Sequence, residues 1–201
     1  MCEKNQLFGR LSLWECLTDA FLRGVIEKYH YEERDAVLLG RVASDIKICI
    51  KDQESFCVSY DERKWPLERE ALVTLTLGPG IDLLQERYHS GGLLMESYML
   101  ENCSSELLRL GYEKIHRLIV EQTGMYAARV SFFGGEEEYS LNRMAEELKK
   151  RDIKNIACTA DYCLRPTKSA AYLVKLCPEE TVVRSICSDC ANRDNCHQCA
   201  R

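Results

Sequence analysis

Four of the twelve cysteines lie within the last fifteen residues as two Cys-x-x-Cys pairs, Cys187 with Cys190 and Cys196 with Cys199. Two thiolates at this spacing in a tight turn can hold one metal ion, and two such pairs complete a tetrahedral site with four sulfur ligands. The same ligands suit an iron–sulfur cluster as well as zinc, although the five-residue spacer is shorter than in most structural zinc sites. His197 could replace one cysteine as a ligand. The alternatives are a reduced tail without metal and, less in keeping with a reducing compartment, disulfide bonds.

The other residues with chemical potential are scattered along the chain. Five further cysteines lie among apolar neighbours and are expected to be buried apolar side chains, namely Cys16, Cys49, Cys57, Cys103 and Cys158. Three dispersed histidines, His30, His89 and His116, are expected to be structural. The segment Gly78-Pro79-Gly80 lacks the third glycine of a dinucleotide-binding fingerprint, and no P-loop, His-Glu-x-x-His or Gly-x-Ser-x-Gly motif occurs. The sequence therefore contains no recognisable self-contained catalytic site.

Composition narrows the class of protein. The 201 residues carry 27 basic and 32 acidic side chains, a net charge of -5, so a nucleic-acid partner is not expected. With 46% apolar residues the chain can bury one full core. No apolar run is long enough for a transmembrane helix, and residues 1–10 lack the apolar segment of a signal peptide. We therefore expect a cytoplasmic protein without a membrane span.

The pattern of apolar residues predicts mixed helices and strands. Helices are expected over 12–29, 32–50, 81–89, 93–123 and 141–150, and strands over 56–60, 71–77, 126–133, 155–159 and 170–176. Ser12 with Glu15 has the pattern of a capping box, Ser140 is a second N-cap candidate, and Gly124 is expected to end the long helix. This pattern predicts a single α+β domain with a mainly antiparallel sheet. Residues 1–70 form its helical N-terminal part, 71–184 its core and 185–201 a metal-binding tail.

Three stretches of the core resemble the activation domain of cobalamin-dependent methionine synthase, and especially small stand-alone relatives of that domain. They are 76–82 (TLGPGID) followed by 99–101 (MLE) and 104–106 (SSE); 129–148, which contains YSL at 139–141; and 156–159 (IACT) followed by 164–169 (LRPTKS) and Cys187-x-x-Cys190. The resemblance covers roughly 125 residues of the chain. It implies a curved antiparallel sheet with a ligand groove along its edge. It also implies binding of S-adenosylmethionine, which the family presents to an inactive Co(II) cobalamin for reductive methylation.

The resemblance also implies a set of ligand-site residues. Arg129 and Tyr139 match the arginine and the tyrosine of the family's ligand motif, although the segment between them is longer here and lacks the family's proline. An arginine suits the carboxylate of S-adenosylmethionine, and an aromatic ring suits its cationic groups. The full set is Arg129, Gly135, Tyr139, Ser140, Pro166 and Ser169. Lys168 is a further candidate, and Glu136, Glu137 and Glu138 either attract the ligand's cationic groups or form a solvated acidic loop.

Three functions remain open from the sequence. The first is an accessory protein of corrinoid-dependent methyl transfer that binds S-adenosylmethionine or docks on a corrinoid-binding protein or methyltransferase. The chain lacks the Asp-x-His-x-x-Gly pattern that supplies a histidine ligand to cobalt, so cobalamin would come only with a partner protein. The second is an iron–sulfur redox protein that acts on a corrinoid partner. The third is a non-catalytic interaction module stabilised by zinc.

Overall fold

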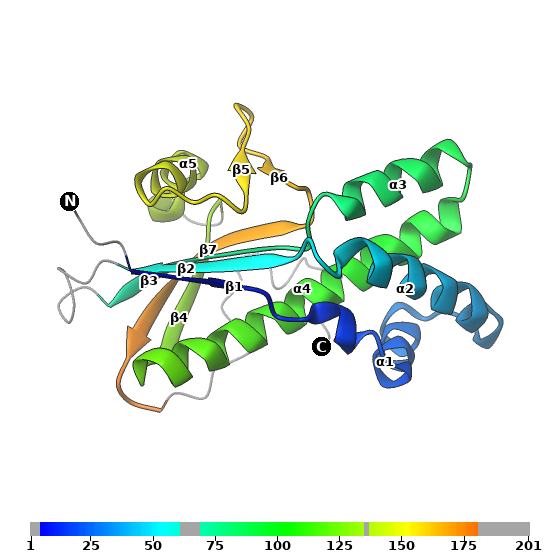
Figure 1. The fold of residues 1–201 in the computed structure, drawn as a ribbon, viewed down its shortest axis with the longest axis horizontal. Helices are drawn as coiled ribbons and strands as arrows, with labels where there is room; N and C mark the ends of the chain where they lie inside the picture. Colours follow the sequence, from blue (N-terminus) through cyan, green and yellow to red (C-terminus); the bar gives the residue numbers. More distant parts are fainter. Residues whose placement is uncertain (1–4, 61–68, 135–136, 181–201) are drawn as a thin grey trace.

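The structure is a computed structural model that describes residues 5–60, 69–134 and 137–180. Its centre is a five-stranded antiparallel sheet in the order β1-β2-β3-β7-β4 (Figure 1). The strands are β1 (Asn5–Gly9), β2 (Ser55–Tyr60), β3 (Glu70–Thr76), β7 (Ser169–Cys177) and β4 (Tyr126–Phe132). A second sheet consists of β5 (Ala157–Cys158) and β6 (Leu164–Arg165). The predicted α+β fold with a mainly antiparallel sheet is confirmed.

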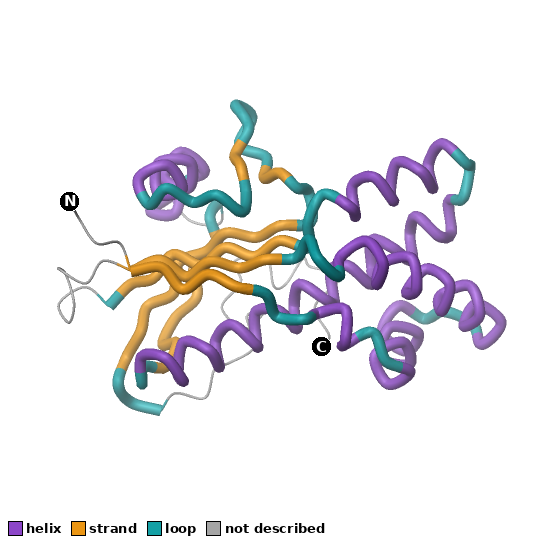
Figure 2. The backbone as a smooth tube through the Cα atoms, viewed as in Figure 1, coloured by secondary structure: helices purple, strands orange, loops and turns teal. Residues whose placement is uncertain are grey.

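Helices cover both faces of the large sheet and extend beyond one end of it. They are α1 (Asp19–Tyr29), α2 (Ala36–Ile50), α3 (Gly80–Ser90), α4 (Leu94–Thr123) and α5 (Leu141–Lys150), with short 3-10 turns at Leu13–Cys16, Glu33–Asp35 and Glu137–Tyr139. In Figure 2, α4 passes along one face of the sheet, whereas α5 and the small sheet lie over the other face. Helices α2 and α3 pack against α4 beyond the sheet end. Among the described residues, no helix is both long and apolar enough to cross a membrane.

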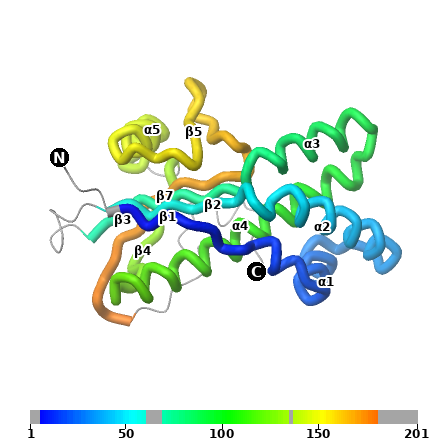
Figure 3. The backbone as a smooth tube through the Cα atoms, viewed as in Figure 1, coloured from blue at the N-terminus to red at the C-terminus, as the bar shows by residue number. Residues whose placement is uncertain are grey.

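The alternation of side chains along the central strands explains this layering. In β3, Val73 and Leu75 belong to the core under α4, whereas Leu72 packs in the smaller core under α5. In β7, Tyr172 faces the α4 core and Leu173 the α5 core. Successive side chains of a strand point to opposite faces, so these central strands are apolar on both sides. Figure 3 shows that the sheet combines strands from the N-terminal part of the chain with strands from its C-terminal half.

Two glycines allow close approaches that this packing needs. A Cβ atom on Gly111 of α4 would lie 2.4 Å from Cδ2 of Leu75, so a side chain there would force Leu75 or the helix to shift. Gly78 has a φ of +90°, and a Cβ atom there would lie 2.5 Å from the Cβ of Gln53. The glycine-proline-glycine turn after β3 thus leads directly into α3 while packing on the end of α2.

Several local predictions are corrected. Ser12 does not cap a helix, because its backbone is left-handed and Leu13–Cys16 form a 3-10 turn; Thr18 caps α1 instead by accepting from the Phe21 amide. β1 was not predicted, and it pairs with the predicted strand β2. The strand expected over 155–159 is reduced to β5, and β6 lies between it and the strand expected over 170–176.

The cysteines of the described part are mostly packed in apolar surroundings. Cys57 and Cys103 are buried, and burial raises the pKa of Cys57 to about 11 and that of Cys103 to about 12. Cys16, Cys49 and Cys158 are partly buried. The predicted burial therefore holds for Cys57 and Cys103, whereas the other three are only partly buried.

Candidate functional site

The connection between β4 and α5 brings Tyr139 against the sheet. Gly134, at a φ of +90°, starts the reversal, and its amide donates to the carbonyl of Tyr139 at 2.7 Å. The Tyr139 side chain is 1% exposed and packs with Leu72 of β3 and Leu148 of α5. The ring therefore anchors the turn to the α5 face of the sheet.

Two guanidinium groups lie over this one ring. The Cζ atom of Arg129 on β4 is 6.0 Å from the ring centroid of Tyr139, and that of Arg143 on α5 is 5.1 Å from it. Cations at such distances are attracted by the ring's quadrupole. Within the described part of the chain, the Tyr139 hydroxyl has no hydrogen-bond partner. Arg143 is also paired with Glu70, whereas Arg129 is exposed and carries the planar guanidinium that suits a carboxylate.

Ser140 lies directly after this turn and caps α5. Its hydroxyl accepts from the Arg143 amide at 3.3 Å, as expected for an N-cap serine. Gly135 and Glu136 lie outside the described residues. We use "the Arg129–Tyr139 site" for Arg129, Tyr139, Ser140 and Arg143.

Pro166 and Ser169 lie at the opposite end of β7. The Ser169 hydroxyl is 2.8 Å from the Thr76 hydroxyl oxygen and 2.6 Å from the Pro166 carbonyl oxygen. The Thr167 amide donates to the Asp82 carboxylate at 3.1 Å. These contacts join residues 76–82 to residues 164–169, so two of the three stretches identified in the sequence meet in space.

The five predicted site residues that the structure describes therefore fall into two groups. Arg129 pairs with Lys175 near the end of β7, and Ser169 begins that strand. Six residues of strand span about 20 Å. Alternate residues of a strand point to the same face, so Ser169 of β7 shares the α5 face with Ala171 and Leu173. Lys175 belongs to the same alternating set, and its partner Arg129 therefore lies on that face as well. The structure brings Arg129 and Tyr139 together but does not place Pro166 and Ser169 beside them.

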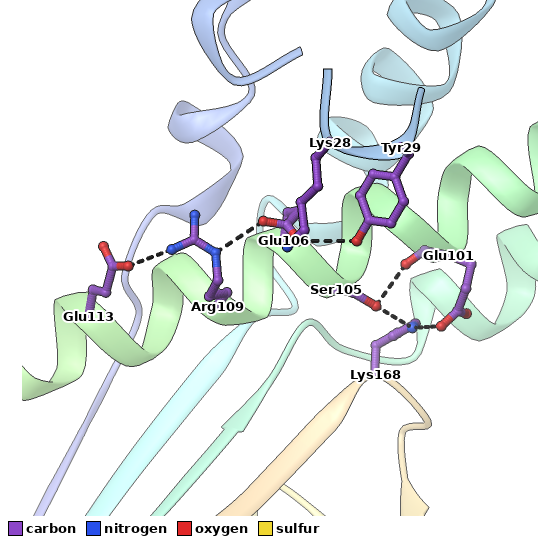
Figure 4. A network of polar contacts seen from close by, with 8 residues as sticks. All are labelled: Lys28, Tyr29, Glu101, Ser105, Glu106, Arg109, Glu113 and Lys168. Atoms are coloured by element: carbon purple, nitrogen blue, oxygen red, sulfur yellow. Dashed lines mark hydrogen bonds and ion pairs between the residues drawn. The ribbon is translucent and has the colours of Figure 1, made fainter. Parts of the chain in front are cut away.

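The middle of α4 links these regions to the rest of the helical layer (Figure 4). Lys168, beside Ser169, pairs with the Glu101 carboxylate and donates to the Ser105 hydroxyl at 3.2 Å. On the adjacent side of α4, the Glu106 carboxylate accepts from Lys28 at 2.7 Å and from Arg109 at 3.0 Å. The contacts of Lys168 involve Glu101 of the stretch 99–101 and Ser105 of the stretch 104–106, and the contacts of Lys28 and Arg109 involve Glu106 of the latter.

The Glu106 contacts change the ionisation of two groups. Burial by itself would raise the pKa of Glu106, but the hydrogen bonds and charges of Lys28 and Arg109 outweigh it, and the pKa is lowered. Burial, followed by the charge of Glu106, raises the pKa of Tyr29, whose hydroxyl lies 3.1 Å from the Glu106 carboxylate. Glu106 thus remains ionised and holds α1 against α4. This is a structural role, and it needs no ligand.

The candidate metal ligands Cys187, Cys190, Cys196 and Cys199 lie outside the described residues. Within the described ranges, no group of three or more His, Cys, Asp or Glu side chains could hold a metal ion. The predicted centre in the tail therefore stays a prediction.

Arg143 and its partner Glu70 were not among the site residues that the sequence predicts. The Arg143 guanidinium lies 3.4 Å from a Glu70 carboxylate oxygen on β3, and it donates to the Glu138 carbonyl at 3.0 Å. Arg143 belongs to α5, whereas Tyr139 lies in the 3-10 turn before the Ser140 N-cap, so no helical spacing in the sequence pairs the two residues.

Comparison with known proteins finds no matching family model and no matching curated protein. Among the solved structures, the chain is similar to the crystal structure of the MetH reactivation domain bound to AdoHcy (S-adenosylhomocysteine). The TM-score is 0.59 at 10% sequence identity, and the match covers 92% of this chain and 82% of the other. At this identity the likeness establishes a shared fold.

Proposed function

We propose that this chain is an accessory protein of corrinoid-dependent methyl transfer that binds S-adenosylmethionine, or its demethylated product AdoHcy, at the Arg129–Tyr139 site. The observation that carries the proposal is the placement of Arg129 over Tyr139 in a fold similar to that of a reactivation domain solved with AdoHcy. The sequence motif predicts both residues, and their contact in space supports the proposal.

The site has the chemistry that one end of this ligand requires. The Arg129 guanidinium would pair with the carboxylate of the amino-acid moiety, since guanidinium and carboxylate form the stronger class of hydrogen bond. The adjacent Glu137 and Glu138 carry negative charge near the site and would favour the ligand's ammonium and sulfonium groups. Ser140 completes this end of the proposed site, and Gly135 is assigned to it from the sequence motif alone.

Pro166 and Ser169 belong to a separate part of the proposed groove. They lie about 20 Å along the strand from Arg129, which exceeds the reach of a single side chain. We assign them to the far end of the proposed groove, where the Ser169 hydroxyl contacts Thr76 and the Pro166 carbonyl.

The partner in this proposal is a corrinoid-binding protein or methyltransferase in the cytoplasm. The chain carries no cobalt-ligating Asp-x-His-x-x-Gly pattern, so the corrinoid is assigned to the partner. Within the assembly, this chain would hold the methyl donor while the partner presents the cobalt.

Calorimetric titration of the whole chain with S-adenosylmethionine and with AdoHcy tests the proposal. Saturable binding with one ligand per chain would support it. Comparing the two ligands shows how much the sulfonium charge contributes. An absence of binding at millimolar ligand would remove the ligand role and leave the fold assignment intact.

The four cysteines of the tail favour a second candidate, an iron–sulfur redox protein acting on the same class of partner. Four thiolates in two Cys-x-x-Cys pairs suit such a cluster. A brown protein purified without oxygen, with visible absorbance and bound iron, would support this function. A colourless protein with bound zinc would instead support a zinc-stabilised interaction module.

A further inference from the structure

We infer that Arg143 is a positioning residue of the Arg129–Tyr139 site and holds the Tyr139 ring where Arg129 can stack on it. The inference rests on the proposed ligand function and adds a residue that the family motif does not contain.

Arg143 contacts the chain on both sides of Tyr139. Its Nη1 donates to the carbonyl of Glu138, directly before the tyrosine, at 3.0 Å. Its backbone amide donates to the hydroxyl of Ser140, directly after the tyrosine, at 3.3 Å. Its guanidinium also lies over the tyrosine ring. The guanidinium thus contacts both the Glu138 carbonyl and the ring of Tyr139, while the backbone amide, which any residue at this position would supply, contacts Ser140.

Glu70 connects this arrangement to the sheet. The carboxylate of Glu70 at the start of β3 lies 3.4 Å from Nη2 of Arg143, and both side chains are partly buried. Glu70 pairs in register with Lys175, which in turn pairs with Arg129. Through Glu70, Arg143 therefore anchors the turn to the row of paired sheet residues that also contains Arg129.

The geometry of arginine matters more here than its charge. The planar guanidinium presents a fixed fork of donors and can stack on a ring while it bonds at its edge. A lysine at this position would keep the charge but could not make the stacked and forked contacts together. A site held by such supporting contacts loses affinity when they are removed, because the free state then samples other positions.

Arg151 provides a matched control in the same region. It also ties α5 to the sheet, since its Nη1 donates to the Ser59 carbonyl at 2.7 Å and its Nε pairs with Glu147 at 2.7 Å. It has no part in the contacts around Tyr139. A variant of Arg151 therefore reports what general loosening of α5 does to ligand binding.

The experiment compares AdoHcy affinity by calorimetry for the unmutated chain, Arg143→Gln, Arg143→Lys and Arg151→Gln. We expect Arg143→Gln to weaken binding about tenfold or more, the effect of losing a charged hydrogen bond. Arg143→Lys should lose most of the same affinity, and Arg151→Gln should bind within about twofold of the unmutated chain. Hydrogen exchange of the peptide 137–143 gives a readout that is independent of ligand, and it should rise in both Arg143 variants and not in Arg151→Gln.

The possible contrary results are distinct. Arg143→Lys binding as tightly as the unmutated chain would mean that charge alone matters and would overturn the positioning role. Equal losses in Arg143→Gln and Arg151→Gln would reduce Arg143 to a general support of α5, and unchanged exchange over 137–143 would likewise overturn the inference. No binding by the unmutated chain would overturn the proposed function itself, together with the inference that rests on it.

Discussion

The guanidinium of Arg129 lies over the Tyr139 ring, with 6.0 Å between Cζ and the ring centroid, although the two residues come from a strand and a separate turn. Tyr139 is almost fully buried, whereas Arg129 is exposed on the edge strand β4. The buried ring therefore supports a guanidinium group that solvent or ligand can reach. This arrangement leads to the first prediction.

Replacing Arg129→Ala should weaken S-adenosylmethionine binding by roughly 1.5–3 kcal/mol, the range for a hydrogen bond to a charged group. Calorimetric titration measures this. Because Arg129 is exposed, thermal stability should change little. Arg117→Ala is the control, since Arg117 is exposed on α4 over the opposite face of the sheet. Similar affinities for the unmutated chain and Arg129→Ala would remove the assigned carboxylate contact.

Glu106→Ala should destabilise the fold by about 3 kcal/mol, because it breaks a largely buried ion pair and leaves Lys28 without its acidic partner. Glu113→Ala is the matched control on the same helix, since Glu113 bonds Arg109 at an exposed position and its loss should cost less than about 1 kcal/mol. Urea unfolding of both variants at neutral pH measures the difference. Equal losses would show that Glu106 is no more important to stability than a surface residue.

The sequence predicted the long helix well and the N-terminal region poorly. The helix expected over 93–123 is α4 (Leu94–Thr123), since a sustained helical pattern and a terminal glycine define it locally. The cap predicted at Ser12 is wrong because the Glu54 carboxylate accepts from the Leu13 amide at 2.9 Å and holds the chain in a 3-10 turn. That contact crosses 41 positions of sequence, so no local pattern contains it. β1 is a short edge strand whose pairing with β2 is equally non-local.

The candidate site also combines residues that a local motif identifies with residues whose role depends on non-local contacts. Arg129 and Tyr139 could be selected because a family motif names the two residue types. Arg143 could not, because its role depends on the turn that brings Glu138 and Glu70 within reach of one guanidinium. The separation of Ser169 from Arg129 along β7 could not be predicted either, because it depends on the register of the paired strands.

Acid should destabilise the fold through His116. This side chain is 6% exposed and packs edge-on against the Tyr172 ring, and burial lowers the pKa of His116 from 6.5 to about 4. The unfolded chain therefore binds the proton more readily, so stability is lost as pH falls from 6.5 towards 4 and is retained above that window. The loss from this group should reach about 3 kcal/mol below the folded-state pKa.

The change His116→Phe isolates this effect. The phenylalanine keeps an aromatic ring against Tyr172 and cannot take up a proton, so the variant should show a shallower loss of stability between pH 6.5 and 4. Urea unfolding across that range measures it, with His89→Phe as the control because His89 is exposed on α3. Identical pH profiles for the unmutated chain and His116→Phe would contradict the assignment.

The tail should bind one metal centre through Cys187, Cys190, Cys196 and Cys199 acting as a unit. Thiolates must lose their protons to bind, so occupancy should fall in acid. Changing Cys190→Ser should abolish stoichiometric metal while the core stays folded, whereas Cys163→Ser, at an exposed cysteine of the described core, should leave the metal content unchanged. The measurement is zinc and iron analysis of protein prepared without oxygen, because a cluster can be lost in air. Near-zero zinc and iron in that sample, with all four thiols freely reactive, would show that the two Cys-x-x-Cys pairs do not form a metal site.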